Sequence, residues 1–256
     1  MPTAPHGRGL CVLTLHRIVE RCQADHDITW SSFRALLDGI AAGGTRVDAR
    51  LGSEDCLRGR AVALTFDDGT ADHLRAGEEL AGRGIPGLFF VPAGRMGRPG
   101  HLGAPQLRAL SALGHGVGSH GWSHLPLDEE MPPEVVTREL RDSKRLLEDA
   151  AGTGVVLFAP PGGIDCASTR RELPAHGYAA SRSMRWGIYG SLRDRWSIPC
   201  VPVTEWTLAR GWVAQVLRAH ELPLAMKSTW ALKRLMPDAV RTSVRRTLHR
   251  SFRAAG

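Results

Sequence analysis

Seven short apolar runs recur along the chain, and helix-like segments lie between them. The runs span residues 10–15, 61–66, 87–91, 116–119, 155–159, 178–181 and 198–203. They are continuous rather than alternating between apolar and polar residues, which is typical of strands covered on both faces. Repeated strand–helix alternation predicts an α/β fold with a parallel sheet. This many repeats favour a closed or partly closed β/α barrel over an open doubly wound sheet.

Five segments between the runs predict helices, at residues 31–42, 71–83, 104–113, 132–150 and 168–176. In the fourth, two prolines suit the first turn. One face of this segment then carries Val136, Leu140, Ser143 and Leu147. The chain has 256 residues, of which 43% are apolar and 23% charged, which is ordinary globular usage. The chain is therefore long enough for one large domain with a substantial core.

Positive charge is concentrated near the C-terminus. Residues 207–256 hold ten lysines and arginines but only two acidic residues, so they carry a formal charge of +8, whereas residues 1–206 carry −1. We therefore predict a catalytic body at residues 1–206 and a basic helical extension at residues 207–256. Within the extension, an apolar residue recurs at every fourth position and predicts an amphipathic helix. These residues are Val240, Val244, Leu248 and Phe252.

Two arrangements fit this basic amphipathic helix. It can dock its apolar stripe on the catalytic body, which we favour, or it can make peripheral contact with an anionic membrane surface. No recognised nucleic-acid-binding motif accompanies the charge, so we expect no nucleic-acid partner. The apolar run at residues 10–15 is too short for the core of a signal peptide, and no run is long enough to span a bilayer. These features predict a cytoplasmic protein.

Two adjacent aspartates, Asp67 and Asp68, follow the predicted strand at residues 61–66, and Gly69 allows a sharp exit from it. Neighbouring side chains of an extended segment point to opposite sides. One carboxylate can therefore face a metal ion while the other faces an attacking water. The alternative is structural, because an aspartate at this position can also cap the helix that follows.

His120 and His124 lie four residues apart, a spacing that can bind one ion from a helix face or from a looped strand end. Alone, the pair also fits two surface histidines. Together with an aspartate it forms an Asp-His-His set that leaves coordination positions open for water, as a catalytic zinc site requires. Imidazole favours zinc, and such a set also accepts cobalt, nickel or iron.

Two further strand ends carry candidate residues. The loop at residues 160–163 is stiff and rich in glycine, so it can direct backbone N–H groups toward a developing oxyanion, although an ordinary turn fits it equally well. His16 ends the first predicted strand, where a lone histidine is more often structural than catalytic. The carboxyl ends of the strands carry the chemistry in parallel β/α folds, which raises the case for His16.

The order TFDDG, HGWSH and FAPPGG resembles the polysaccharide deacetylase family, also called the NodB-homology family or carbohydrate esterase family 4. The resemblance implies a distorted β/α barrel and a divalent metal ion, with Zn²⁺ favoured, bound by Asp68, His120 and His124. Asp67 would be the general base. The segment LTLHRI resembles the circularly permuted branch, in which a motif usually near the C-terminus comes first, and His16 would then be the catalytic acid.

The resemblance covers roughly residues 10–205, with two departures from the family pattern. Gly121 stands where the family usually has serine or threonine. Ala159 stands where many members carry an arginine that orients the base, which leaves the tuning of Asp67 open. A non-catalytic glycan-binding protein on the same scaffold would fit the loss of that arginine, whereas the intact aspartate and metal set favour an enzyme.

The chemistry implied is hydrolysis of an amide, with removal of an N-acetyl or similar acyl group from an amino sugar or a sugar-containing metabolite. Asp67 would take a proton from the attacking water, and His16 would donate one to the leaving amine. We expect Trp122, Pro161 and Gly162 to contact this N-acylated substrate, with a backbone N–H near Gly162 binding the oxyanion. The alternative substrate is a non-sugar amide.

Overall fold

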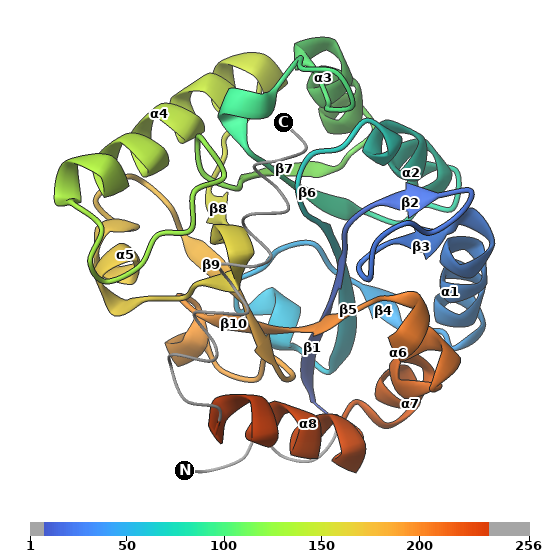
Figure 1. Cartoon of the computed structure of the whole chain (residues 1–256). Helices are drawn as coiled ribbons and strands as arrows, with labels where there is room; N and C mark the ends of the chain where they lie inside the picture. Colours follow the sequence, from blue (N-terminus) through green and yellow to red (C-terminus); the bar gives the residue numbers. More distant parts are fainter. Residues whose placement is uncertain (1–7, 236–256) are drawn as a thin grey trace. The chain divides into compact units, whose positions relative to one another are not determined.

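Seven parallel strands form a closed barrel in the structure, a computed structural model that describes residues 8–235 (Figure 1). The strands are β1 Gly9–Leu15, β5 Arg60–Phe66, β6 Gly87–Val91, β7 Gly116–Ser119, β8 Leu157–Phe158, β9 Ala180–Trp186 and β10 Ile198–Pro202. Neighbours follow the order β5-β6-β7-β8-β9-β10-β1, and pairing of β1 with β5 closes the ring. The predicted β/α barrel is confirmed, and the open sheet is excluded.

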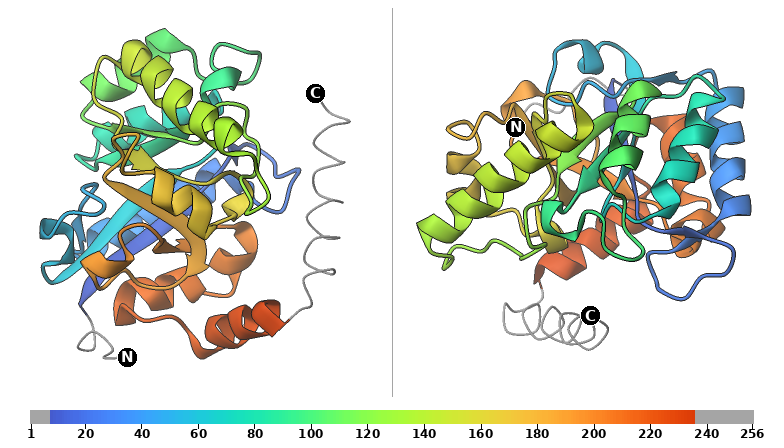
Figure 2. Two further views of the ribbon diagram at one scale, coloured as in Figure 1. Left: turned by 90° about the vertical axis from the view of Figure 1, so that its left-hand side faces the viewer. Right: turned by 90° about the horizontal axis from the view of Figure 1, so that it is seen from above.

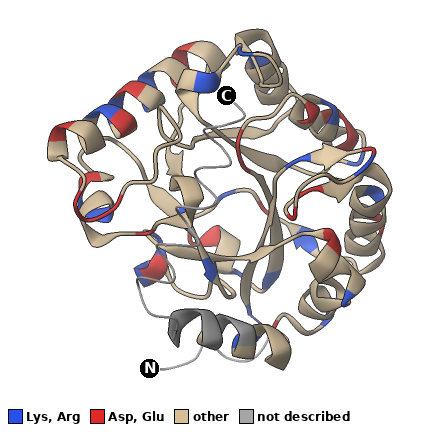
Figure 3. Ribbon diagram, viewed as in Figure 1, with Lys and Arg blue, Asp and Glu red and all other residues tan. Residues whose placement is uncertain are grey.

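Helices surround this barrel on its outer side (Figures 1 and 2). They are α1 Trp30–Ala42, α2 Asp72–Ala81, α3 Ala104–Ala112, α4 Pro133–Ala151, α5 Ala167–Glu172, α6 Glu205–Ala209 and α7 Trp212–Ala219. Each of the five predicted helices is present, with ends shifted by a few residues. In α4 the predicted face is buried. Acidic and basic residues alternate along the exposed side of α4 (Figure 3).

Alternate residues of each strand face inward. Below the carboxyl ends of the strands, small and apolar side chains fill the inside of the barrel. They include Leu10, Val12, Ala61, Ala63, Leu88, Phe90, Ala159, Ala180 and Cys200. The barrel is distorted on one side, where β8 has only two residues. There β7 and β8 pair at one position, Ser119 with Phe158, and the register between β9 and β10 shifts. This matches the distorted barrel that the sequence implied.

Three two-residue strands were not predicted: β2 Ile18–Val19, β3 Ile28–Thr29 and β4 Arg46–Val47. Segments this short show no periodicity, so the sequence gives no pattern to detect. β2 pairs with β3 just beyond the end of β1. β4 pairs with the start of β5, at the opposite edge of the barrel. The two small additions therefore mark the two ends of the barrel.

The compact unit that contains the barrel extends to Leu222 rather than ending after residue 206, where the charge changes. Val213 and Val216 of α7 are buried. His220 Nε2, just beyond α7, lies 2.8 Å from the carbonyl oxygen of Gly9 at the start of β1. These contacts hold α6 and α7 in the first unit, so a change in charge does not mark the structural division.

The second compact unit, Pro223–Gly256, contains α8 Leu224–Leu235. The predicted apolar stripe of Val240, Val244, Leu248 and Phe252 lies outside the described residues, so its docking or membrane role stays a prediction. No helix in the described part of the chain combines the length and the apolar character that crossing a bilayer requires.

Candidate active site

The carboxyl ends of β1, β5 and β7 bring three predicted residues to one edge of the barrel. Thr14 and Thr65 face inward just below this edge, with their hydroxyl oxygens 3.0 Å apart. Two residues further along each strand, His16 and Asp67 emerge on the same side, and His16 Nε2 lies 3.9 Å from Asp67 Oδ2. His120 directly follows β7. Strand alternation therefore places these side chains near one another.

Asp68, His120 and His124 form a cluster that could hold a metal ion, with ligand atoms all within 4.8 Å of one another. His124 Nε2 lies 2.9 Å from Asp68 Oδ1, and His120 Nε2 lies 3.5 Å from it. His120 Nδ1 lies 2.7 Å from the carbonyl oxygen of Ala159. Because a carbonyl only accepts, Nδ1 carries the proton and Nε2 keeps its lone pair for a cation. The donor set fits a divalent cation that takes nitrogen and oxygen ligands.

The charge states of the cluster also suit a cation. Burial opposes ionisation of Asp68, but its polar contacts with the imidazoles of His120 and His124 outweigh burial and hold the pKa of Asp68 well below its usual range. Burial lowers the pKa of His124, although Asp68 opposes that shift. An anionic carboxylate and a neutral imidazole are the forms that bind metal.

Two of the candidate ligands adopt left-handed backbone conformations, with φ of 76° at Asp68 and 63° at His124. Aspartate and histidine tolerate this region better than most residues, but it still costs about 1–3 kcal/mol and is concentrated at functional sites. Gly69 has φ of 58°, and a Cβ there would lie 2.8 Å from Val91 Cγ1. The sharp exit predicted for TFDDG thus needs glycine at this position.

Arg182 of β9 forms a buried ion pair with Asp67. Its Nη2 donates to both carboxylate oxygens, and both side chains are almost inaccessible to solvent. β8 and β9 pair Phe158 with Ser181, so Ala159 and Arg182 follow as neighbours across the two strands. The arginine missing at position 159 is therefore supplied from the adjacent position of the next strand.

This pair sets the charge of Asp67. Burial opposes ionisation of the carboxyl group, but Arg182, His120 and His16 outweigh burial and lower the pKa of Asp67. Asp67 is 2% exposed. It is therefore a buried carboxylate that is ionised at neutral pH, as a general base requires. The departure at Ala159 relocates the guanidinium rather than removing it from the base.

His16 stands at the end of β1 with its side chain 22% exposed. Its backbone is held in place because His73 Nε2 lies 2.8 Å from the His16 carbonyl oxygen. His26, in the loop between β2 and β3, places its ring centroid 5.1 Å from that of His16. His16 thus lies beside the candidate base and is accessible to solvent, which are the requirements for a proton donor at this edge.

Glu139 of α4 anchors the loop between the two histidines that are candidate metal ligands. Trp122 N, Ser123 N and Ser123 Oγ donate to its carboxylate at 2.7, 3.0 and 2.6 Å. Gly121 has φ of 74°, and a Cβ there would lie 3.0 Å from Glu139 Oε2. Glycine at position 121, where serine or threonine was expected, therefore leaves room for the buried carboxylate to reach this loop.

The three residues predicted to contact substrate lie around the same loop. Trp122 is half-buried, and its carbonyl oxygen accepts from Gly94 N at 2.8 Å. Pro161 is buried, next to Gly121, in the short 3-10 turn Pro161–Gly163 that follows β8. Gly162 is exposed, with φ of 63°. Contact of these residues with a substrate stays a prediction.

Sequence reasoning missed two residues that shape the site. Glu139 lies on the face of α4 that was predicted to be buried, and an acidic residue among apolar neighbours was an available signal. Arg182 directly follows the predicted strand at residues 178–181 and belongs to no motif that the sequence analysis used. Its role depends on the pairing of β8 with β9, which a linear pattern does not show.

Comparisons with known proteins agree with this geometry. A family model described as Polysaccharide deacetylase matches residues 54–181, half of the chain, and this range includes all three candidate ligands and Asp67. Peptidoglycan-N-acetylglucosamine deacetylase PgdA of Listeria monocytogenes is 30% identical over 106 residues, which cover 41% of this chain and 22% of that protein. The matched stretch therefore spans about a fifth of that relative.

Two solved structures share the fold over most of the chain. IcaB from Ammonifex degensii has a TM-score of 0.70 and 26% identity, covering 84% of this chain and 98% of that one. The Streptococcus pyogenes deacetylase PplD, solved in complex with acetate, has a TM-score of 0.74 and 20% identity, covering 85% and 99%. On its fold, its motifs and these matches, the chain belongs to the polysaccharide deacetylase family.

Proposed function

We propose that this protein is a metal-dependent N-deacetylase that removes an acetyl or similar acyl group from an amino sugar or a sugar-containing metabolite. The observation that carries the proposal is the meeting of two features at one barrel edge: the Asp68-His120-His124 cluster and the Asp67–Arg182 pair. Taken alone, a set of metal-binding residues can serve structure only, and a buried ion pair can serve only to stabilise the fold. A metal-binding set beside an ionised base supports hydrolysis.

A metal ion would be held by Asp68, His120 and His124, and when bound it would polarise the acyl carbonyl and acidify a water molecule. Zinc is the favoured ion because two of the three donors are imidazoles, and cobalt, nickel or iron are the alternatives. The N-acetylglucosamine deacetylase named among the relatives supports a sugar amide as substrate.

The chain's own residues would then move protons and hold charge. Asp67 accepts the proton of the attacking water, while Arg182 keeps that carboxylate ionised and in place. A backbone N–H near Gly162 donates to the oxyanion. His16 donates a proton to the leaving amine, which is otherwise too basic to depart. Each general acid or base contributes about 10²–10⁴-fold.

The competing view of a non-catalytic glycan-binding protein rested on the missing arginine at position 159. Since Arg182 supplies a guanidinium to Asp67, that reason no longer holds. A non-sugar amide remains the alternative substrate. Cytoplasmic location, the circularly permuted relationship inferred from His16, and peripheral membrane contact through the basic extension stay proposals.

Acetate release tests the function directly. The purified protein is incubated with N-acetylglucosamine oligomers and, in parallel, with a non-sugar N-acetylated amine. Each reaction is run as purified, with a chelator, and after Zn²⁺, Co²⁺, Ni²⁺ or Fe²⁺ is added back. We expect release from the sugar that the chelator abolishes and one of the metals restores. His120→Ala should lose both bound metal and release, whereas His176→Ala, at the opposite barrel edge near the start of β9, should keep both. Sugar turnover that persists without metal would contradict the proposal.

A further inference from the structure

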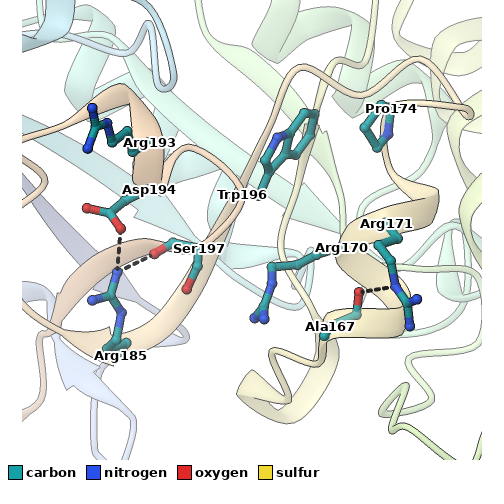
Figure 4. Close-up of a pocket in the computed structure, with 9 residues that line it drawn as sticks. All are labelled: Ala167, Arg170, Arg171, Pro174, Arg185, Arg193, Asp194, Trp196 and Ser197. Atoms are coloured by element: carbon teal, nitrogen blue, oxygen red, sulfur yellow. Dashed lines mark hydrogen bonds and ion pairs between the residues drawn. The ribbon is translucent and has the colours of Figure 1, made fainter.

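A recess of about 640 Å³ lies outside the barrel, between α5 and the connection from β9 to β10 (Figure 4). This volume is in the range of small-molecule sites. Its lining contains four arginines, which come from both walls. The lining residues are Ala167, Arg170, Arg171, Pro174, Arg185, Arg193, Asp194, Trp196 and Ser197. The proposed deacetylase chemistry uses none of them.

The recess carries more positive than negative charge. Arg170 pairs with Asp165 at 2.7 Å, and Arg185 lies 3.8 Å from Asp194. The other two arginines of the lining, at positions 171 and 193, form no ion pair within 4.0 Å among the described residues. Glu129 also interacts electrostatically with Arg171. Four guanidinium groups are thus opposed by three carboxylates, which leaves one positive charge to attract an anion.

The two walls are tied together by specific contacts. Ser197 Oγ donates to Asp165, the residue that also holds Arg170. Arg185 Nη2 donates to the Ser197 carbonyl oxygen at 2.9 Å. Trp196 is half-buried and packs against the apolar cluster under α4 and α5. The two walls are therefore held together, while the side chains of Arg171 and Arg193 are exposed to solvent and accessible to a ligand.

Chain connectivity keeps the recess close to the active-site edge. Asp165 follows Gly163 of the Pro161–Gly163 turn by two residues, and Arg185 follows Arg182 by three. Two and three residues of extended chain span at most about 7 and 11 Å. A glycan of a few sugars that places one acetylated unit at Asp67 can therefore reach the recess with another unit.

We propose that this recess binds a negatively charged group of the substrate, a carboxylate or a phosphate on a sugar near the one that is deacetylated. Arginine is the side chain best suited to this, because its planar fork binds both oxyanions with two hydrogen bonds. The enzyme would then prefer acidic acetylated glycans over neutral ones. This inference rests on the proposed deacetylase function and names its substrate class.

Binding is measured first, on the full-length protein with chelator present so that no turnover occurs. The probes are a neutral N-acetylglucosamine tetramer, the same tetramer ending in a uronic acid, and the same tetramer carrying a terminal phosphate. We expect one or both acidic tetramers to bind about tenfold more tightly than the neutral one at low salt, and less so as salt rises. The acidic tetramer that binds more tightly shows whether the recess prefers a carboxylate or a phosphate.

A matched pair of double variants assigns the effect to the recess. Arg171→Gln with Arg193→Gln should remove about tenfold of the preference for the acidic probe. Arg138→Gln with Arg145→Gln removes the same charge from exposed positions of α4 and should leave the preference unchanged. Equal affinity for the three probes, or the same loss in both double variants, would overturn the proposal.

Turnover separates this inference from the deacetylase function itself. With metal restored, the ratio of kcat/KM for the acidic tetramer to that for the neutral one should fall about tenfold in the recess variant and stay constant in the α4 variant. If acetate is released with no preference for the acidic substrate, the role proposed for the recess is refuted and the deacetylase function still holds. If the acidic tetramers bind selectively but no probe releases acetate, the deacetylase function is refuted and anion binding by the recess still holds.

Discussion

Two buried aspartates at opposite edges of the barrel distinguish the end that carries the candidate active site from the opposite, structural end. Asp67 follows β5, whereas Asp48 follows β4 beside the start of β5. They are 2% and 3% exposed, and both bind arginine. Arg182 is fully buried and lies 115 residues from Asp67 in sequence. Arg46 and Arg50 lie within two residues of Asp48, with side chains 39% and 59% exposed.

The two aspartates also differ in the groups that surround them. Burial opposes ionisation of Asp48, but hydrogen bonds from Arg50 and Arg46 lower its pKa to about 2. Its donors are permanently charged, so it has no proton to exchange near neutral pH. Asp67 has one guanidinium on it and also faces two imidazoles, His16 and His120. Asp67 therefore borders the candidate metal-binding cluster and the candidate acid, whereas Asp48 contacts no candidate site residue.

The largest expected contrast comes from the same substitution at both positions. Asp67→Asn should lower kcat by about 10²–10⁴-fold, because the general base is lost, while bound metal is retained. Asp48→Asn should leave kcat within about twofold, because no site residue touches it. Steady-state acetate release together with metal analysis compares the two. Equal losses of kcat would mean that the two ends do not differ in role.

Removing the buried guanidinium should have the next largest effect. Arg182→Met removes the largest interaction that offsets the burial of Asp67, so the pKa of Asp67 should rise. A base must be ionised to act, so the acidic limb of the kcat/KM profile should move to higher pH and activity at pH 7 should fall about 10²-fold. Breaking a buried pair can also cost about 3–5 kcal/mol of stability, which thermal melting would detect.

A positional swap keeps this test decisive if the methionine variant folds poorly. Ala159→Arg combined with Arg182→Ala returns a guanidinium to the strand where the family usually carries it. Since the two positions directly follow the paired residues Phe158 of β8 and Ser181 of β9, we expect part of the activity and the original pH profile to return. A swap variant that folds and binds metal, yet keeps the shifted profile, would count against a positioning role for Arg182.

A smaller effect is expected at the anchor of the histidine loop. Glu139→Gln keeps the shape of the side chain but weakens the hydrogen bonds to Trp122 and Ser123, so the second histidine ligand is held less firmly. Residues that support metal ligands are typically worth 10–100-fold in affinity, and we expect about tenfold for this conservative change. Competition with a chromogenic chelator measures it, and an unchanged metal affinity would show that the loop needs no anchor.

The smallest effect on activity belongs to the structural end. The pKa of Asp48 is lowered on folding, so this carboxylate stabilises the fold above its unfolded pKa of about 3.9 and loses that contribution as the pH falls toward about 2. Because its arginine partners are solvated, Asp48→Asn should cost about 1–2 kcal/mol at pH 7. The cost should vanish near pH 2. Denaturant unfolding at both pH values would reveal any cost that persists in acid.

Much of this protein followed from its linear pattern. The continuous apolar runs at residues 61–66 and 87–91 predicted buried parallel strands, since only strands covered on both faces lack alternation. The strand-end positions of Asp68, His120 and His124 predicted a shared edge, because all strands of a parallel barrel end on the same side. These are properties of periodicity and direction, which neighbouring residues carry by themselves.

The tertiary structure decided how the base is held and where the chain divides. Arg182 reaches Asp67 only because β9 pairs with β8 at one register, and a shift by one residue would point the guanidinium out of the barrel. Likewise, α7 belongs to the first unit because His220, directly after α7, contacts the carbonyl oxygen of Gly9 at the start of β1, although 211 residues separate them. Such contacts depend on which segments become neighbours in space, and no local preference of the chain records that choice.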